Sequence, residues 1–246
     1  YADNARLNVR GDGSAANCAF WPGCVFAGNI NTSVISATGM VHVRGSAARL
    51  DMLNTLIISN VSTWCNGVAI AEYARGQIVN TVIARNHTSS YIPLGVYATG
   101  TGAATLVHCT IADNGTYGVY INRGGVCALT NCIVWGHSFF EIDVLAAADH
   151  CCIEGGFGPG THIISSDPRF ADTNALNYQI VWGSPCVNTG ILVGVGVDCI
   201  GVARPYGSGV DLGAYECVPE PGGWGMLGIC TIYNLQFTVL RRRREE

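Results

Sequence analysis

A block of seven residues recurs along the first 156 residues of the chain. The block reads GCVFAGN at 23–29, NTLIISN at 54–60, NTVIARN at 80–86, HCTIADN at 108–114 and NCIVWGH at 131–137, with a degenerate copy, HCCIEGG, at 150–156. The four central copies begin at 54, 80, 108 and 131, so the steps between them are 26, 28 and 23 residues. A unit that repeats at this period is the signature of a solenoid, in which each coil contacts only its neighbours.

The residues inside each block indicate a β-strand, because apolar residues alternate around a β-branched centre and strong helix formers are scarce. Stacking the central copies as adjacent parallel strands would point four residues to the same side: Ile57, Ile83, Ile111 and Val134. A second column of strands is predicted by GMVHV, GVAIA, GVYAT and GVYIN, which begin at residues 39, 67, 95 and 118. The sequence therefore predicts an all-β parallel solenoid of about six coils over residues 1–165. A propeller is the alternative, although its blades need about 40 residues or more.

The overall composition agrees with β structure. Only 12% of the residues are charged and 32 are glycine, whereas helical proteins usually cover their surfaces with Glu and Lys. Hydrophobic residues make up 49% of the chain, which is enough to close a core. The net charge of -4 makes nucleic acid an unsuitable partner.

Asparagine closes four of the blocks at the same position, where the strand must turn: Asn29, Asn60, Asn86 and Asn114. Asn tolerates a left-handed backbone better than other non-glycine residues, so we expect that conformation there. Side chains at equivalent positions can also bond to one another along the axis. His108 and His150 open blocks that elsewhere open with Asn, so both are interpreted as repeat variants rather than as metal ligands or catalytic bases.

The chain has 12 cysteines but no pair of CxxC units of the kind that binds zinc. This number favours an oxidising compartment, unless the residues act as small buried apolar side chains. Cys24, Cys109, Cys132 and Cys151 share the second position of their blocks. Parallel strands are ~4.8 Å apart and a disulfide needs Cβ atoms at ~3.8 Å, so we expect a ladder of reduced thiols. Cys186 and Cys199 lie outside the ladder and are the better candidates for a disulfide.

The seven-residue block resembles the right-handed parallel β-helix repeat family, and the expected handedness comes from this resemblance. From residue 166 onward another pattern begins, with Asp167-Pro168, Phe170, Tyr178, Gly183-Ser184-Pro185, Asp198, Gly201, Arg204-Pro205 and residues 211–216 at characteristic places. It resembles the terminal segment of the choice-of-anchor Q family of surface proteins, which more often has Asp where this chain has Asn188. Residues 166–217 are expected to cover the apolar end of the last coil.

The last 29 residues have three parts, which are the motif Val218-Pro219-Glu220-Pro221, an apolar stretch at 222–240, and the cluster Arg241, Arg242, Arg243 and Arg244. This tail resembles the PEP-CTERM sorting signal. The resemblance implies export to the surface or extracellular matrix of a Gram-negative bacterium, transient contact with the inner membrane, and cutting by an exosortase-type protease. As a helix the stretch would span ~28 Å, close to the ~30 Å core of a bilayer. The alternative is a buried apolar helix or strand with a basic end.

Aromatic residues collect between the two strand columns, where the coil length varies: Trp64, His87 with Tyr91, Tyr117, and Phe139 with Phe140. Insertions in solenoids often line a binding face, so these residues are candidates for stacking on sugar rings. The alternative is that they fold back over the coil as packing.

Carboxylates do not form one column, because Asp51, Glu72, Asp113, Glu141, Asp143 and Glu154 are scattered among different positions. No catalytic residue, metal site or cofactor is predicted, and a calcium site has no ligand set to support it. The favoured function is non-enzymatic adhesion or polysaccharide binding. The alternative is a polysaccharide lyase or glycoside hydrolase with its catalytic coils upstream of Tyr1, which begins inside repeat-like sequence.

Overall fold

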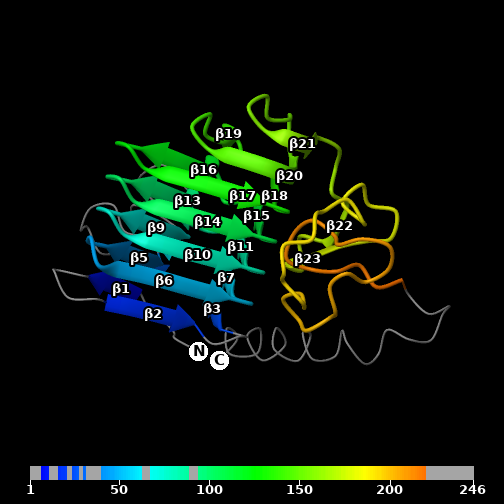
Figure 1. Ribbon diagram of the computed structural model, residues 1–246, viewed down its shortest axis with the longest axis horizontal. Helices are drawn as coiled ribbons and strands as arrows, with labels where there is room; N and C mark the ends of the chain where they lie inside the picture. The colour runs from blue at the N-terminus through cyan, green and yellow to red at the C-terminus, as the bar shows by residue number, and fades with distance from the viewer. Residues whose placement is uncertain are drawn as a thin grey trace.

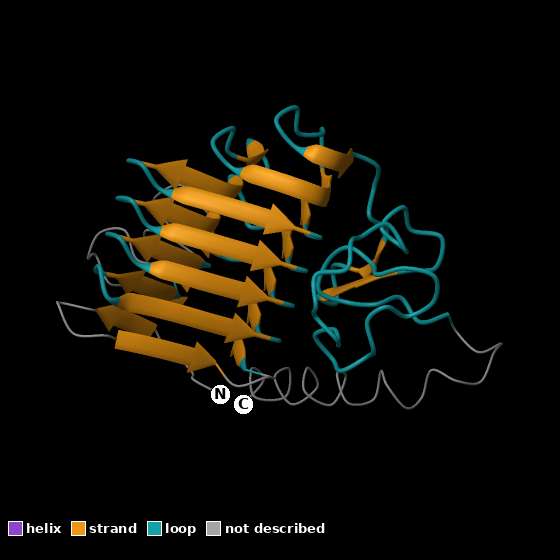
Figure 2. Cartoon of the chain, in the orientation of Figure 1, coloured by secondary structure: helices purple, strands orange, loops and turns teal. Residues whose placement is uncertain are grey.

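The computed structural model describes residues 7–10, 16–20, 24–27, 30–31, 40–62, 67–88 and 94–219. Within these ranges every regular element is a β-strand (Figure 2). The described residues contain no helix that could cross a membrane. The apolar stretch at 222–240 lies outside these residues.

Three parallel sheets run along the molecule as its coils stack (Figure 1). The first contains β1 (Leu7–Arg10), β5 (Val41–Arg44), β9 (Val68–Ala71), β13 (Leu94–Thr99), β16 (Tyr117–Asn122) and β19 (Phe140–Ile142). The second contains β2 (Ala16–Phe20), β6 (Ala48–Leu53), β10 (Arg75–Val79), β14 (Ala103–Val107), β17 (Val126–Thr130) and β20 (Ala147–Ile153), then β18 (Ile133–Trp135), β15 (Thr110–Ala112), β11 (Val82–Ala84), β7 (Leu56–Ile58) and β3 (Val25–Ala27), with β21 (Thr161–Ile164) paired to β20. The third contains β4 (Ile30–Asn31), β8 (Val61–Ser62) and β12 (His87–Thr88).

The predicted stacking of the repeat blocks is confirmed. Ile57 pairs in register with Ile83, Ile83 with Ile111, and Ile111 with Val134, all between parallel strands. The four side chains are fully buried in the same apolar cluster. The chain is therefore a parallel β-solenoid, as the repeat indicates.

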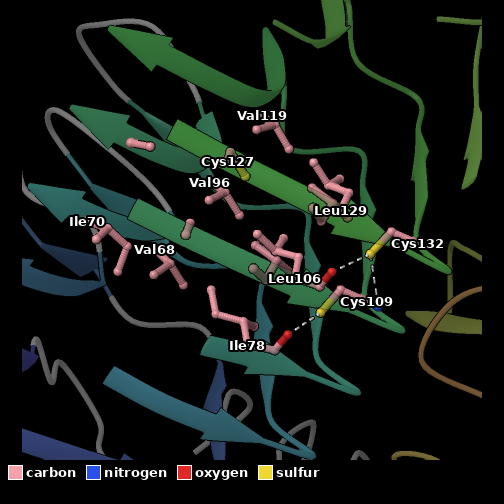
Figure 3. Close-up of a cluster of buried hydrophobic side chains, with 14 of the residues drawn as sticks. Val68, Ile70, Ile78, Val96, Leu106, Cys109, Val119, Cys127, Leu129 and Cys132 are labelled. Atoms are coloured by element: carbon pink, nitrogen blue, oxygen red, sulfur yellow. Dashed lines mark hydrogen bonds between the residues drawn. The ribbon is translucent and has the colours of Figure 1, made fainter. Parts of the chain in front are cut away.

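The interior of the solenoid is filled by like-on-like stacks. Val68, Val96 and Val119 are register partners in the first sheet, and Ile78, Leu106 and Leu129 are partners in the second. Figure 3 shows both stacks pointing into the space between the sheets. Because successive strand residues face opposite sides, β6 alternates between buried and exposed positions. Apolar burial along these stacks supplies the main stabilisation of the fold.

Glycine lies next to the first residue of β9, β13 and β16, at Gly67, Gly95 and Gly118, because adjacent coils approach closely there. A Cβ atom at Gly67 would lie 2.0 Å from the carbonyl oxygen of Gly95, and one at Gly95 would lie 2.7 Å from the carbonyl oxygen of Gly118. Any larger residue would force the coils apart. The repeated glycine in the second column of strands thus has a packing cause.

The irregular segment at 166–217 packs against the side of the solenoid, not over its last coil as expected (Figure 1). It contains the antiparallel pair β22 (Phe170–Asp172) and β23 (Asn177–Ile180). Tyr178 and Tyr215 share an apolar cluster with Leu56 and Val82 of the solenoid. The expectation was wrong because β7 and β11 are apolar on their outward faces too, and these faces must also be buried. We call residues 166–217 the lateral segment.

The end of the last coil is covered from within the solenoid. Phe157, in the turn before β21, and Ile163, on β21, are partly buried against the central core. The turn and the last strand therefore perform the covering that the sequence assigned to the lateral segment.

Hydrogen bonds fix the lateral segment to the polar residues at the edge of the strands. The Asn131 side-chain amide donates to the Ile191 carbonyl oxygen (2.7 Å) and accepts from the Ile191 amide (2.9 Å). Asn80 donates to the Val197 carbonyl oxygen at 2.7 Å. Asn80 and Asn131, which occupy equivalent positions of different coils, thus bond to different residues of the lateral segment.

A buried ion pair organises the lateral segment itself. Arg204 donates to Glu216 Oε1 at 2.5 Å and to the Gly213 carbonyl oxygen at 2.8 Å, and both charged side chains are fully buried. Glu216 also accepts from the backbone amides of Tyr206 (2.7 Å) and Asp211 (2.9 Å). A charge pair is tolerated in the interior when its remaining donors and acceptors are satisfied, and these bonds meet that condition except at Arg204 Nε, which is buried without a hydrogen-bond partner.

Two carboxylates beside the ion pair, Asp198 and Asp211, bond to backbone amides. Asp198 accepts from Val202 (2.8 Å) and Glu216 (2.9 Å). Asp211 accepts from Asn188 (2.7 Å) and Cys217 (2.6 Å), and burial raises the pKa of its carboxyl to about 6. This network therefore holds the segment in shape, and it contains four of the residues on which the choice-of-anchor resemblance rests: Asp198, Arg204, Asp211 and Glu216.

Candidate functional site

A group of aromatic side chains covers part of the outward face of the first sheet. Tyr97 lies on β13, Tyr117 and Tyr120 lie on β16, and Phe139 and Phe140 lie where β19 begins. Alternation along the strands turns these rings outward while their strand neighbours fill the core. We call these five residues the aromatic patch.

The rings of the aromatic patch are in continuous contact. Tyr97 and Tyr120 are register partners, with ring centroids 5.7 Å apart and an angle of 10° between the ring planes. Tyr117 lies 5.0 Å from Tyr120, 5.5 Å from Phe139 and 6.0 Å from Phe140. These separations are those of attractive aromatic pairs. The patch is therefore a connected surface that extends from coil to coil.

The patch has an exposed end and a more buried end. Phe139 and Phe140 are 62% and 54% exposed, whereas the three tyrosines are half-buried. Burial raises the pKa of the Tyr120 hydroxyl, and Tyr97, Tyr117 and Asp143 beside it add to the shift. Flat apolar faces and polar groups thus lie next to each other, as the binding of a sugar ring requires.

The structure brings together only part of the predicted aromatic set. Tyr117 and Phe139 belong to the patch, but His87 is exposed on β12, in a different sheet. Trp64 and Tyr91 lie outside the described residues. Tyr97 and Tyr120 were missed because the prediction considered loops, although the Tyr repeated in GVYAT and GVYIN was a visible signal.

The block-closing asparagines form a buried ladder. Asn60 Nδ2 donates to Asn86 Oδ1 at 2.8 Å, and Asn86 Nδ2 donates to Asn114 Oδ1 at 2.9 Å. The Asn86 amide also donates to the Ile57 carbonyl oxygen at 2.9 Å. All three asparagines are fully buried, whereas Asn29 lies outside the described residues. The ladder ties each coil to the next.

The left-handed conformation predicted for these asparagines is wrong by one position. Positive φ occurs at the preceding residues, which are Ser59 (56°), Arg85 (52°) and Asp113 (54°). The turn points these residues outward. The asparagine side chain that follows is then directed inward, where it bonds to the asparagines of the neighbouring coils. A second set of positive φ angles falls on the residues that open the blocks, which are Asn54, Asn80, His108, Asn131 and His150.

His108 takes the place of an asparagine in this second column, as expected of a repeat variant. Its Nε2 lies 3.0 Å from Asn131 Nδ2. Burial lowers the pKa of His108 to about 3, and the positive charge of Arg204 acts in the same direction. The ring is therefore neutral and structural.

The Asn ladder ends on a buried pair that the sequence did not reveal. Asn114 Nδ2 lies 3.4 Å from His137 Nε2, and His137 Nδ1 lies 2.5 Å from Glu141 Oε2. The His137 backbone amide donates to Glu141 Oε1 at 2.8 Å. Such a pair resembles a catalytic dyad, but the His137 side chain has no exposed surface and Asn114 occupies its second nitrogen. It completes the ladder and has no access to a substrate.

The other acidic residues singled out from the sequence have structural contacts of different kinds. Glu72 pairs with Arg44 at 2.8 Å, Asp113 accepts from the Tyr178 hydroxyl at 2.8 Å, and Glu154 accepts from the Gly136 amide at 2.8 Å. Asp143 accepts from the Leu145 amide, and Asp51 is exposed on β6. The described residues present no column of carboxylates on one face of the strands.

The cysteine ladder is present, but the predicted disulfide is not. Cys109, Cys132 and Cys151 are buried, reduced and stacked, with the backbone amides of Cys109 and Cys132 each 3.4 Å from the next sulfur. Cys186 and Cys199 belong to separate apolar clusters and are not joined. Cys186 instead neighbours Cys152, and this contact together with burial raises the pKa of the Cys152 thiol. Cys24 is half-buried.

Comparison with known proteins gives one result. A family model described as "Right handed beta helix region" matches residues 12–168, which is more than half of the chain. Neither the curated proteins nor the solved structures contain a match to this chain.

Proposed function

Since this chain belongs to the right-handed β-helix family, we propose that it is a non-enzymatic protein that binds polysaccharide through the aromatic patch, at the surface or in the extracellular matrix of a Gram-negative bacterium. The observation that carries this proposal is the continuous run of rings along Tyr97, Tyr120, Tyr117, Phe139 and Phe140. A solenoid presents such a run as a strip, because equivalent positions of successive coils line up.

The chemistry of the patch favours a chain of sugars over an apolar partner. Tyr97 and Tyr120 stack on each other, and the apolar faces of pyranose rings can stack on the exposed rings of Phe139 and Phe140 at the end of the patch. Tyrosine hydroxyls and the Asp143 carboxylate lie beside them and can bond to sugar hydroxyls. A rigid β-scaffold holds both kinds of group in place before binding, which lowers the entropic cost of association.

Alanine at both Phe139 and Phe140 is expected to weaken polysaccharide binding at least about tenfold, or ~1.4 kcal/mol. These rings are the most exposed of the patch, so their removal should leave the core intact. Native gels containing soluble β-glucan, dextran or hydroxyethyl cellulose measure binding as retardation of the protein band.

Trp182→Ala provides the control, because Trp182 is 65% exposed on the lateral segment, outside the patch. It should migrate like the unsubstituted protein in every gel. Equal retardation of the double variant and the unsubstituted protein would count against the patch as the binding surface.

The proposed surface location rests on the tail, of which Val218 and Pro219 are exposed and Glu220, Pro221 and Arg241 to Arg244 lie outside the described residues. Residues 210–217 at the end of the lateral segment are buried, and exposure begins at Val218. This boundary agrees with a removable tail that an exosortase-type protease cuts after brief contact of the tail with the inner membrane. Residues 1–165, 166–217 and 218–246 are then solenoid, lateral segment and sorting tail.

Deleting residues 218–246 should leave the melting temperature nearly unchanged while the protein loses its surface location in cells. A longer deletion that starts at Val210 removes the buried residues Asp211 and Glu216, so it should unfold the lateral segment. Differential scanning calorimetry and fractionation of the producing cells measure the two effects. Aggregation of the shorter deletion on expression would show that the tail is part of the fold.

A further inference from the structure

Three potential metal ligands converge where the solenoid ends. Asp149 Oδ1 lies 3.0 Å from His150 Nδ1 and 2.9 Å from His162 Nδ1. Asp149 and His150 belong to β20, and His162 belongs to β21, the strand paired to it. The donor atoms of the three residues all lie within 4.8 Å of one another.

The backbone at the corner of the coil makes this convergence possible. Neighbouring residues of a strand normally face opposite sides, which would separate Asp149 from His150. His150 has a φ of 47° and His162 a φ of 51°, so both adopt the left-handed conformation of the block-opening column. The same column carries Asn80 and Asn131 in earlier coils, where the lateral segment bonds to it.

The column ends in two accessible imidazoles, unlike its earlier members Asn80, His108 and Asn131, which are buried. The His162 side chain is 68% exposed and that of His150 is 19% exposed, whereas Asn80 and Asn131 are fully buried. The two imidazoles are therefore not needed as partners of the lateral segment. Imidazole is also the side chain most often used to bind transition metals.

The separations of the donor atoms fit a metal ion. Bonds of ~2.0–2.2 Å to zinc place neighbouring ligand atoms ~3.0 Å apart at right angles and ~3.4 Å apart in a tetrahedron. The observed 2.9 Å is a hydrogen bond between His162 and Asp149, and both it and the 3.0 Å separation lie a few tenths of an ångström below the tetrahedral value, so a small movement of the side chains would admit the ion. The rings of His150 and His162 stack with centroids 4.1 Å apart, and the exposed His162 ring can turn to direct its nitrogen at an ion.

Two further observations support a metal ion between Asp149, His150 and His162. His150 Nδ1 is buried but lacks the geometry of a hydrogen bond to any neighbour, in spite of its distance from Asp149. The Thr161 hydroxyl donates to Asp149 Oδ1 at 2.6 Å and fixes the orientation of the carboxylate. Metal ligands are usually held in this way by a second group.

We propose that Asp149, His150 and His162 bind one Zn²⁺ ion, which fastens β21 and the preceding turn to the last full strand of the solenoid. Two imidazoles and a carboxylate suit zinc and its transition-metal neighbours, whereas Mg²⁺ and Ca²⁺ prefer oxygen ligands alone. The end of a sheet is the place where an unpaired edge invites fraying or association. An ion that joins β20 to β21 stabilises the element that covers the core with Phe157 and Ile163.

Isothermal titration of the full chain with ZnCl₂ should show one equivalent bound in the micromolar range, with a higher melting temperature in excess zinc. His150→Asn and His162→Asn should each weaken binding at least about tenfold. Asn occupies the equivalent left-handed positions of earlier coils, so these variants preserve the backbone. His87→Ala, at an exposed histidine on β12, should bind zinc like the unsubstituted protein.

Cobalt distinguishes this site from the cysteines of the chain. Co²⁺ at Asp149, His150 and His162 should give weak visible absorption without the intense near-ultraviolet band of a thiolate ligand. Three results would each overturn the proposal: a thiolate band at the first equivalent, full affinity in both Asn variants, or no heat of binding at ~100 μM zinc.

Discussion

Arg204→Ala is expected to destabilise the protein by about 3–5 kcal/mol, because it leaves the Glu216 carboxylate buried without its counter-charge. Arg204 also donates to the carbonyl oxygens of Asp211 and Gly213, so its removal frees buried acceptors too. The lateral segment should detach first, since the ion pair lies within it. Urea denaturation followed by tryptophan fluorescence measures the loss, and limited proteolysis locates it.

Two variants separate the effect of charge from the effect of deleting a large side chain. Arg75→Ala removes an exposed arginine from β10 and should change the free energy of unfolding by no more than about 0.5 kcal/mol. Adding Glu216→Gln to Arg204→Ala should restore part of the stability, because it neutralises the stranded carboxylate. If the single and double variants unfold at the same urea concentration, lost packing rather than charge explains the effect.

The fold of the solenoid could be predicted because equivalent residues of successive repeats become register partners on neighbouring strands. Once Ile57, Ile83 and Ile111 occupy the same position of successive blocks, parallel stacking is the arrangement that buries all of them together. The side on which the lateral segment lies could not be predicted in the same way, because that segment has no repeat. A signal was nevertheless present in LII at 56–58 and VIA at 82–84, since a strand that is apolar at every position is buried on both faces.

The sequence identified single aromatic residues of the candidate site, but not the pairs of residues that the stacking of coils brings together. Phe139 and Tyr117 were identified as candidates for stacking on sugar rings, but the alignment of Tyr97 with Tyr120 depends on the register between coils. The Asp149 cluster was missed for a related reason. His150 and His162 are 12 residues apart along the chain, and only the pairing of β20 with β21 makes them neighbours.

The resemblance to the terminal segment of a surface-protein family indicated which residues of the lateral segment are characteristic, but not which of them contact one another. It identified Asp198, Arg204 and residues 211–216 as characteristic, and these are the residues of the buried network. It did not indicate that Arg204 and Glu216 bond to each other or that the segment lies along β7, β11 and β15. Those relations follow from burial, because charged groups inside a protein must find partners.

Asn86→Ala should cost about 3 kcal/mol of unfolding free energy, since Asn86 is the central member of the buried ladder. Its side chain accepts from both nitrogens of Asn60 and donates to Asn114 Oδ1 and to the Ile57 carbonyl oxygen. Each lost bond costs ~1 kcal/mol, and the acceptors left behind are buried away from water. Chemical denaturation of the purified protein gives the value.

Asn86→Asp tests whether hydrogen bonds or side-chain volume explain this loss. Aspartate nearly preserves the shape, but it places an oxygen where Asn86 Nδ2 now faces two acceptors, Asn114 Oδ1 and the Ile57 carbonyl oxygen. The aspartate variant should therefore be at least as unstable as the alanine variant, because it adds a buried charge to the lost donors. Asn174→Ala, at an exposed asparagine that accepts a single 3.3 Å bond from Arg85, should lie within about 0.5 kcal/mol of the unsubstituted protein. Should the aspartate variant instead be clearly more stable than the alanine variant, filling of space and not the ladder would hold these coils together.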